Sequence, residues 1–352
     1  MATDAAVSGE GLLIPLIDFQ RFLHGSPAER ATTAKAMLDG FQTAGFVYLE
    51  NHSMPADKLR HTFSRSADFF DQSLAAKLEL SWTTPEANRG YSSPGREKVT
   101  QLQDMASVEK MRSEVPDLKE SFEMGRDSDP AHGNPWPRDE GKLEGFRADM
   151  VDFFDRCQQM HQDVMRAVAL GMGLDEAYFD AFIDDADNTL RLLHYPEVKA
   201  DVFRANPGQV RAGEHSDYGS VTLLFQDNRG GLQVRSPNGR FVDATPIEGT
   251  VVINAGDLLA RWSNDTIKST LHRVVEPPRK EGEEYPARYS IAFVSPPSLS
   301  LALTRRGGRY FCNPNFKELI ETLPGTYATE QDKKYGGVNC GDYLVQRLKM
   351  TY

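Results

Sequence analysis

Between Thr189 and Val294 the chain is a series of short apolar runs separated by turns containing glycine, proline, asparagine or aspartate. Such runs are typical of β-strands, and their number limits the possible folds more than any other feature of the sequence. The runs are TLRLLHYP, VRAGEHSD, SVTLLFQ, GLQVRS, TVVINAGD, LLARWS, STLHRVV and ARYSIAFV. Many short strands with frequent turns predict a double-stranded β-helix, or jelly roll, as the core.

The N-terminal part mixes strand and helix patterns. The runs IPLIDF (14–19) and GFVYLEN (45–51) predict strands on either side of a helix from about Pro27 to Gly45. Residues 55–80 carry apolar side chains at helical spacing. These patterns predict an α/β arrangement ahead of the jelly roll.

The middle of the chain contains a loop pattern and a long helix pattern. An amphipathic helix is expected at about Leu143–Met172, with Gly173 as its stop. The segment 82–100 is rich in proline, glycine and serine, which predicts a loop. Such a loop either closes over a site through Asn88 and Tyr91 or is exposed and idle.

Length and composition fit one large domain or two ordinary ones. Of the 352 residues, 39% are hydrophobic, which is sufficient for a sizeable core. We expect a mixed α/β fold in which residues 1–130 form an N-terminal α/β segment. Residues 131–352 then form a jelly-roll catalytic region with its long supporting helix, and both parts build one structural unit. The final run YGGVNCGDYLVQRLKMTY is expected to be helical.

Charge and cysteine content limit the partners and the compartment. A net charge of -11 and a pI near 5.3 argue against nucleic acid or a membrane surface, so we expect a small-molecule substrate. Cys157, Cys312 and Cys340 have neither the even number nor the spacing of a disulfide framework or a zinc site. The start MATDAAVSGEGLL has no signal-peptide pattern and no stretch is apolar enough to cross a membrane, so we expect a cytoplasmic protein. The oligomeric state remains open.

A histidine-x-aspartate pair and a later histidine form a candidate metal site. His215 and Asp217 lie in GEHSDYGS, and His272 lies in STLHRVV. Two histidines and one carboxylate are the ligands of non-haem iron(II) sites that leave one face of the metal open. Residues i and i+2 of a strand point to the same side, so we expect both side chains of the pair to face the metal and Ser216 to point away.

A second pair predicts a receptor for a carboxylate. Arg288 and Ser290 lie in ARYSIAFV, again two residues apart on one expected strand. A guanidinium beside a hydroxyl suits a carboxylate ligand. Together with an iron site, this pair indicates a 2-oxo acid cosubstrate; the alternative for Arg288 alone is a surface salt bridge.

The chain resembles the iron(II)- and 2-oxoglutarate-dependent dioxygenases of the isopenicillin N synthase-like superfamily. The resemblance runs from IPLIDF through the two histidines and the aspartate to the Arg-x-Ser pair. Within that superfamily a closer resemblance is to the fungal thymine 7-hydroxylases. It is carried by WTTPEANRGYS, GREKVTQL, LRLLHYP, GQVRAGEHSDYGS, GDLLARWSNDTIKST, HRVVEPP and YFCNPN.

The resemblance implies a cofactor, a cosubstrate and a reaction. It implies that His215, Asp217 and His272 bind iron(II), while Arg288 and Ser290 hold the distal carboxylate of 2-oxoglutarate. The reaction would consume O2, release succinate and CO2, and hydroxylate the 5-methyl group of thymine or a similar pyrimidine base.

The resemblance also implies roles for aromatic and basic side chains. Tyr195 would assist in binding 2-oxoglutarate. Arg191 would donate to a pyrimidine carbonyl, and Tyr218 would stack on the ring unless it is a core or turn residue. Phe311, in YFCNPN, would complete the substrate pocket.

One segment departs from the family pattern. Residues 293–309, FVSPPSLSLALTRRGGR, separate the Arg-x-Ser strand from YFCNPN and look inserted. Phe311 therefore either returns to the pocket after a looped excursion or is replaced there by Phe293 or Val294. A gene-model error and an altered substrate preference both explain such a segment.

Three functions from different classes remain possible at this point. The first is a pyrimidine-base hydroxylase, and the second is an oxygenase of secondary metabolism with another small substrate. The third is a metal-binding protein that the segment 293–309 has inactivated. A zinc hydrolase with the same ligands is weaker, because it leaves the Arg-x-Ser pair without a role.

Overall fold

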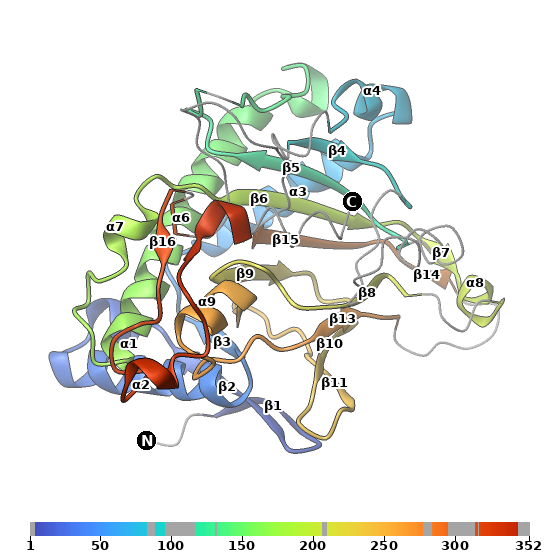
Figure 1. The fold of residues 1–352 in the computed structure, drawn as a ribbon. Helices are drawn as coiled ribbons and strands as arrows, with labels where there is room; N and C mark the ends of the chain where they lie inside the picture. The colour runs from blue at the N-terminus through green and yellow to red at the C-terminus, as the bar shows by residue number, and fades with distance from the viewer. Residues whose placement is uncertain are drawn as a thin grey trace.

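The computed structural model describes residues 4–82, 89–95, 117–130, 132–205, 210–276, 284–294, 314–315 and 317–343. Its architecture is mixed α/β, as predicted, with a nine-stranded sheet, a four-stranded sheet and two small strand pairs (Figure 1). The order in the large sheet is β1 (Ala5–Gly9), β2 (Leu12–Asp18), β3 (Phe46–Glu50), β12 (Val251–Ala255), β9 (Val221–Gln226), β15 (Arg288–Val294), β6 (Thr189–Tyr195), β5 (Glu120–Gly125) and β4 (Gly90–Ser92).

The small sheet carries two of the candidate metal ligands. Its order is β11 (Phe241–Asp243), β10 (Leu232–Arg235), β13 (His272–Val274) and β8 (Ala212–His215). The two strand pairs are β14 (Glu284–Tyr285) with β7 (Val198–Lys199), and β16 (Leu319–Ile320) with β17 (Val338–Asn339). In the large sheet, strands from both sides of residue 130 are neighbours, since β5 pairs with β6 and β3 pairs with β12.

The longer helices pack on one face of the large sheet. The helices are α1 (Gln20–His24), α2 (Pro27–Thr43), α3 (Ala56–Phe70), α4 (Leu74–Glu79), α6 (Phe146–Gly171), α7 (Asp180–Ile183), α8 (Ala200–Ala205) and α9 (Asp257–Trp262), with short 3-10 turns at Gly141–Leu143 and Glu330–Asp332. The predicted helix after Pro27 is present and begins with a capping box between Ser26 and Glu29. The long predicted helix is α6, and Gly173 follows its end with a φ of 74°.

The large sheet separates two apolar cores, because alternate side chains of each strand point to opposite faces. On one face, Leu223, Ile291 and Phe293 pack with the helices α2, α3 and α6. On the other face, Tyr195 and Ala292 pack with residues of the small sheet. The space between the two sheets is therefore where side chains of β6, β9, β12 and β15 meet those of β8 and β13.

Three local predictions need correction, one in full and two in part. LLARWS does not form a strand: most of it belongs to the helix α9, which buries Leu258, Leu259 and Trp262. The predicted loop 82–100 contains the strand β4, which pairs with β5, while 83–88 and 96–100 lie outside the described residues. The expected C-terminal helix is preceded by the strand β17 and begins only at Cys340, and residues beyond 343 lie outside the described ones.

Within the described ranges, no helix combines the length and the apolar character needed to cross a membrane. Cys157 and Cys340 are buried free thiols, and Cys312 lies outside the described residues.

Candidate active site

The structure brings the three predicted metal ligands together. His215 ends β8, and its antiparallel partner in β13 is His272. The ring centroids of the two imidazoles are 4.3 Å apart. Oδ1 of Asp217 lies 3.8 Å from Nε2 of His215 and 3.7 Å from Nε2 of His272. One potential ligand atom from each residue falls within 4.8 Å of the others.

Asp217 reaches this place by a different route from the one predicted. The strand β8 ends at His215, so Asp217 is not on a strand face. Instead, its backbone carbonyl accepts a 2.7 Å hydrogen bond from the N–H of Asp257 at the start of α9. A Cβ on Gly256 would lie 2.3 Å from the carbonyl oxygen of Gly219, so this close approach requires glycine. The turn around Asp217 is thus held against the helix that follows β12.

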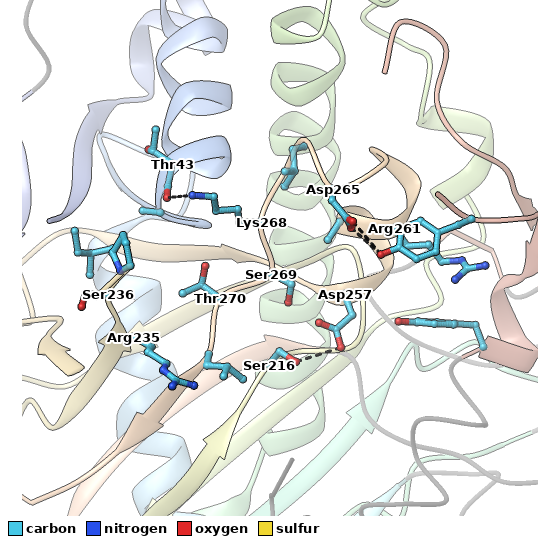
Figure 2. A pocket seen from close by; sticks show the side chains of 18 residues that line it. Thr43, Ser216, Arg235, Ser236, Asp257, Arg261, Asp265, Lys268, Ser269 and Thr270 are labelled. Atoms are coloured by element: carbon cyan, nitrogen blue, oxygen red, sulfur yellow. Dashed lines mark hydrogen bonds between the residues drawn. The ribbon is translucent and has the colours of Figure 1, made fainter. Parts of the chain in front are cut away.

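Ser216 points away from the ligands, as predicted. Its Oγ donates to Oδ2 of Asp257 at 3.2 Å. Figure 2 shows this contact at the edge of a separate cavity of about 700 Å³, which Thr270, Arg235 and Lys268 also line. Ser216 lines this cavity, whereas none of the three candidate metal ligands does.

Backbone carbonyls orient both imidazoles. Nδ1 of His215 lies 2.7 Å from the carbonyl oxygen of Gly213, and Nδ1 of His272 lies 3.2 Å from that of Thr270. An Nδ1–H that donates to a carbonyl leaves the lone pair on Nε2. Each Nε2 faces Asp217, so this arrangement directs two imidazole nitrogens to one point.

The two carboxylate oxygens of Asp217 have different surroundings: Oδ2 accepts hydrogen bonds, and Oδ1 faces the two histidines. Its Oδ2 accepts hydrogen bonds from Oγ1 of Thr222 at 2.5 Å and from Nδ2 of Asn254 at 2.7 Å. Burial opposes ionisation of Asp217, but His272, His215 and these two donors outweigh it and hold the pKa of the carboxyl below its usual value. Burial and the neighbouring His272 lower the pKa of His215. An ionised carboxylate and a neutral imidazole are the forms that bind a metal ion.

The donor set fits a divalent non-haem metal. Two imidazole nitrogens and one carboxylate oxygen on one side of a point leave the opposite side open for other ligands. All three side chains are also fixed by hydrogen bonds from outside the set, as is usual for metal ligands.

Arg288 and Ser290 share one face of β15. Nη1 of Arg288 donates to Oγ of Ser290 at 3.3 Å, and Nη2 donates to Oε1 of Gln226 at 3.4 Å. The guanidinium lies 4.9 Å from the ring centroid of Tyr195. Arg288 is only 4% exposed, so it does not form a surface salt bridge. Among the described residues no carboxylate pairs with it, which leaves a buried cation without a counter-ion.

Arg191 lies on the same face of the sheet as Arg288, but its surroundings differ. Its Nε is 2.9 Å from Oε1 of Glu123, and its Nη2 donates to Oγ of Ser121 at 3.1 Å. Both partners belong to β5, the neighbouring strand. Arg191 is therefore part of an ion pair between neighbouring strands of the large sheet.

The structure does not bring every candidate to this region. Phe293 is fully buried on the helix-facing side of β15, with its ring 5.2 Å from that of Phe154. Tyr218 follows Asp217 in the chain and is half-buried, with contacts to the helix-side core, so it stays a candidate for the substrate wall. Tyr91 is a buried residue of β4 that donates to Glu120, and it is not in a loop. Phe311 and Asn88 lie outside the described residues.

Sequence reasoning missed several polar residues that contact the predicted ones. Thr222, Gln226 and Asn254 are polar side chains in otherwise apolar strands, and Glu123 is a buried carboxylate of β5. This pattern identifies them, because a polar residue at an inward position of a buried strand needs a partner.

Comparisons with known proteins agree with this geometry. Residues 14–139 match the N-terminal domain described as non-haem dioxygenase in morphine synthesis, and residues 186–297 match the 2OG-Fe(II) oxygenase superfamily. The 2-oxoglutarate-Fe(II) type oxidoreductase ppzD of Metarhizium rileyi is 34% identical, with 96% of this chain and 90% of that protein covered. Proline hydroxylase buaE of Petromyces alliaceus is also 34% identical, with 96% and 98% covered.

Solved structures of the thymine 7-hydroxylase of Neurospora crassa are similar over the whole chain. The full-length enzyme in complex with alpha-KG is 59% identical with a TM-score of 0.88, covering 99% of this chain and 100% of that one. Its complex with alpha-KG and thymine is 61% identical with a TM-score of 0.88, covering 98% and 99%. On this identity and coverage, the chain belongs to the 2OG-Fe(II) oxygenase superfamily of 2-oxoglutarate-dependent dioxygenases.

Proposed function

We propose that this protein hydroxylates the 5-methyl group of thymine or a similar pyrimidine base. The reaction converts the base, 2-oxoglutarate and O2 into the hydroxymethyl base, succinate and CO2. The observation that carries the proposal is the 61% identity, over 98% of this chain, to a Neurospora crassa thymine 7-hydroxylase in complex with alpha-KG and thymine. A further complex of that enzyme contains 5-formyluracil, which supports later oxidation rounds on the same carbon.

In this proposal, His215, Asp217 and His272 hold an iron(II) ion. Iron(II) supplies the activation of O2 that hydroxylation of an unactivated methyl group requires. Thr222 and Asn254 keep Asp217 ionised and turned toward the ion, and the carbonyls of Gly213 and Thr270 fix the imidazole rings.

Arg288 and Ser290 bind the distal carboxylate of 2-oxoglutarate. A guanidinium offers two parallel N–H donors to a carboxylate, and the hydroxyl adds a third donor. The ring of Tyr195 lies beside the guanidinium and limits its positions. Because Arg288 is buried without a counter-ion among the described residues, an incoming carboxylate would neutralise it.

We also propose that the two sheets form the walls of a jelly roll, with residues 1–130 as an N-terminal segment of the same unit. Arg191 donates to a carbonyl of the base, and Tyr218 supplies an aromatic wall. Phe311 remains the phenylalanine expected to complete the pocket. We assign Phe293 to the core rather than to the pocket, because it packs against Phe154.

The test is incubation with thymine, iron(II) and 2-oxoglutarate under 18O2, followed by mass spectrometry. The proposal expects 5-hydroxymethyluracil with one atom of 18O. Recovery of unlabelled thymine while 2-oxoglutarate is consumed would contradict it.

A second candidate is a secondary-metabolite oxygenase with another small substrate. It is favoured by the 34% identity to proline hydroxylase buaE and by the departure at residues 293–309. Hydroxylation of a non-nucleobase compound in the same assay would select it.

A further inference from the structure

We propose that Glu123 is a specificity-determining residue, which with Arg191 selects a neutral ring carrying a carbonyl beside an N–H and excludes anions. The inference rests on the proposed function, because it names the substrate class of the same site. It concerns cyclic lactams and imides, of which a pyrimidine base is one.

The position of Glu123 follows from the strand register. Glu123 on β5 pairs with Arg191 on β6, which in turn pairs with Ala292 on β15. Ala292 shares a strand face with Arg288 and Ser290, since the three residues occupy every second position of β15. Glu123 and Arg191 therefore face the space between the two sheets, on the same side as the 2-oxoglutarate receptor.

The two arginines of this face are well separated. Arg288 pairs with Tyr195 on β6, four residues from Arg191. At the rise of a strand, four residues correspond to roughly 14 Å. The receptor and the ion pair thus occupy different ends of the face.

The two ends of this face differ in their net charge. Arg288 has no carboxylate partner among the described residues, whereas Nε of Arg191 lies 2.9 Å from Oε1 of Glu123. Glu123 is 1% exposed, so its charge is desolvated and strongly neutralises that of the guanidinium. The end that holds Arg288 consequently attracts a carboxylate. The net charge at the Arg191–Glu123 end is close to zero, which favours an uncharged ring over an anion.

The ion pair also presents a recognition pattern. A guanidinium only donates hydrogen bonds, and an ionised carboxylate only accepts them. Side by side, they match a ligand edge with an acceptor next to a donor, such as C=O beside N–H. Loss of a hydrogen bond to a charged group changes affinity on the order of 10- to 100-fold.

The experiment compares the wild-type protein with Glu123→Gln, Glu123→Asp and the control Glu120→Gln. Glu120 lies on the same strand but faces the helices, where its Oε2 is 2.9 Å from Nζ of Lys77. The control therefore reports lost strand stability without a change at the recognition pair. All variants are first compared by thermal unfolding.

The first readout is anaerobic equilibrium binding of radiolabelled 2-oxoglutarate with Mn(II), which does not depend on the true substrate. We expect one bound molecule in the wild type and in Glu120→Gln. In Glu123→Gln we expect a second, weaker molecule, because the charge of Glu123 no longer offsets that of Arg191. A single site in Glu123→Gln would overturn the inference, whether or not thymine is the substrate.

The second readout is thymine kinetics. Glu123→Gln should raise KM for thymine on the order of 10- to 100-fold with a smaller effect on kcat, and Glu123→Asp should recover part of the loss. An unchanged KM for thymine would also overturn the inference. A wild type without thymine turnover contradicts the proposed function instead, and the binding readout then decides the inference.

Discussion

Nδ2 of Asn254 donates to Oδ2 of Asp217 at 2.7 Å, on the oxygen that is turned away from the two histidines. Thr222 donates to the same oxygen. The hydrogen bonds to Oδ2 therefore fix the carboxylate while Oδ1 stays available as the ligand atom. Removing one of these donors should weaken metal binding without removing a ligand.

Asn254→Ala and Thr222→Val should each weaken metal binding by about 10- to 100-fold, because the carboxylate loses a donor that orients it. The measurement is anaerobic titration with Co(II), followed by its visible absorption. Thr222→Ser keeps the hydroxyl and is the matched control. Wild-type affinity in Asn254→Ala would show that the hydrogen bond does not orient the ligand.

His215→Ala and Asp217→Ala should abolish turnover, since each removes a member of a three-residue ligand set. Chelation of the wild-type protein should have the same effect, and iron(II) should restore activity while zinc should not. Metal content and succinate formation are measured on the same samples. Full activity in Asp217→Ala would remove the iron-site argument.

Arg288→Ala should chiefly raise KM for 2-oxoglutarate, because the charged donors for the distal carboxylate are lost. Gln226→Ala should have a smaller effect in the same direction, since Gln226 only holds Nη2 of Arg288. Initial rates at varied 2-oxoglutarate and saturating thymine separate the two variants. A change in KM for thymine, with KM for 2-oxoglutarate unaltered, would contradict the role of Arg288 in binding 2-oxoglutarate.

Phe293→Ala should destabilise the fold by about 3–5 kcal/mol, as expected for a phenylalanine buried in a core. The ring packs edge-on against Phe154, and a double-mutant cycle with Phe154→Ala should give a coupling of about 0.5–1.5 kcal/mol. Urea unfolding measures both quantities. Unchanged stability with a raised KM for thymine would return Phe293 to the substrate pocket.

Glu120 should make stability depend on pH in the acid range. Burial opposes its ionisation, but hydrogen bonds from His194, Tyr91 and Lys77 outweigh it and lower its pKa from 4.5. A lowered folded-state pKa stabilises the fold above the unfolded value and loses this effect as pH falls through the folded value. The difference in unfolding free energy between wild type and Glu120→Gln should therefore be larger at pH 7 than below pH 4.5. An equal difference at both pH values would contradict this role.

Most strands and the metal ligands could be predicted because their signals are local. Short runs rich in apolar residues mark β9, β12 and β15, and His215, Asp217 and His272 stand out by residue type. The helix α9 could not be distinguished from a strand, because a six-residue apolar run carries little periodicity.

The contacts of the site depend on long-range register, which one sequence does not contain. Glu123 meets Arg191 only because β5 and β6 pair in one register, although 68 positions separate the two residues. The same register turns Phe293 toward the helices, since odd and even positions of β15 face opposite sides. A shift by one residue would exchange the two faces.

The most direct test of the central claim is single-turnover chemistry after anaerobic reconstitution with iron(II) and 2-oxoglutarate. The protein is exposed to O2 with and without thymine, and succinate and the modified base are quantified. The account predicts that thymine stimulates succinate formation and that 5-hydroxymethyluracil appears in equal amount. Succinate formation that does not respond to thymine would contradict thymine as the substrate. The absence of succinate from both mixtures would contradict 2-oxoglutarate-dependent oxygenase activity.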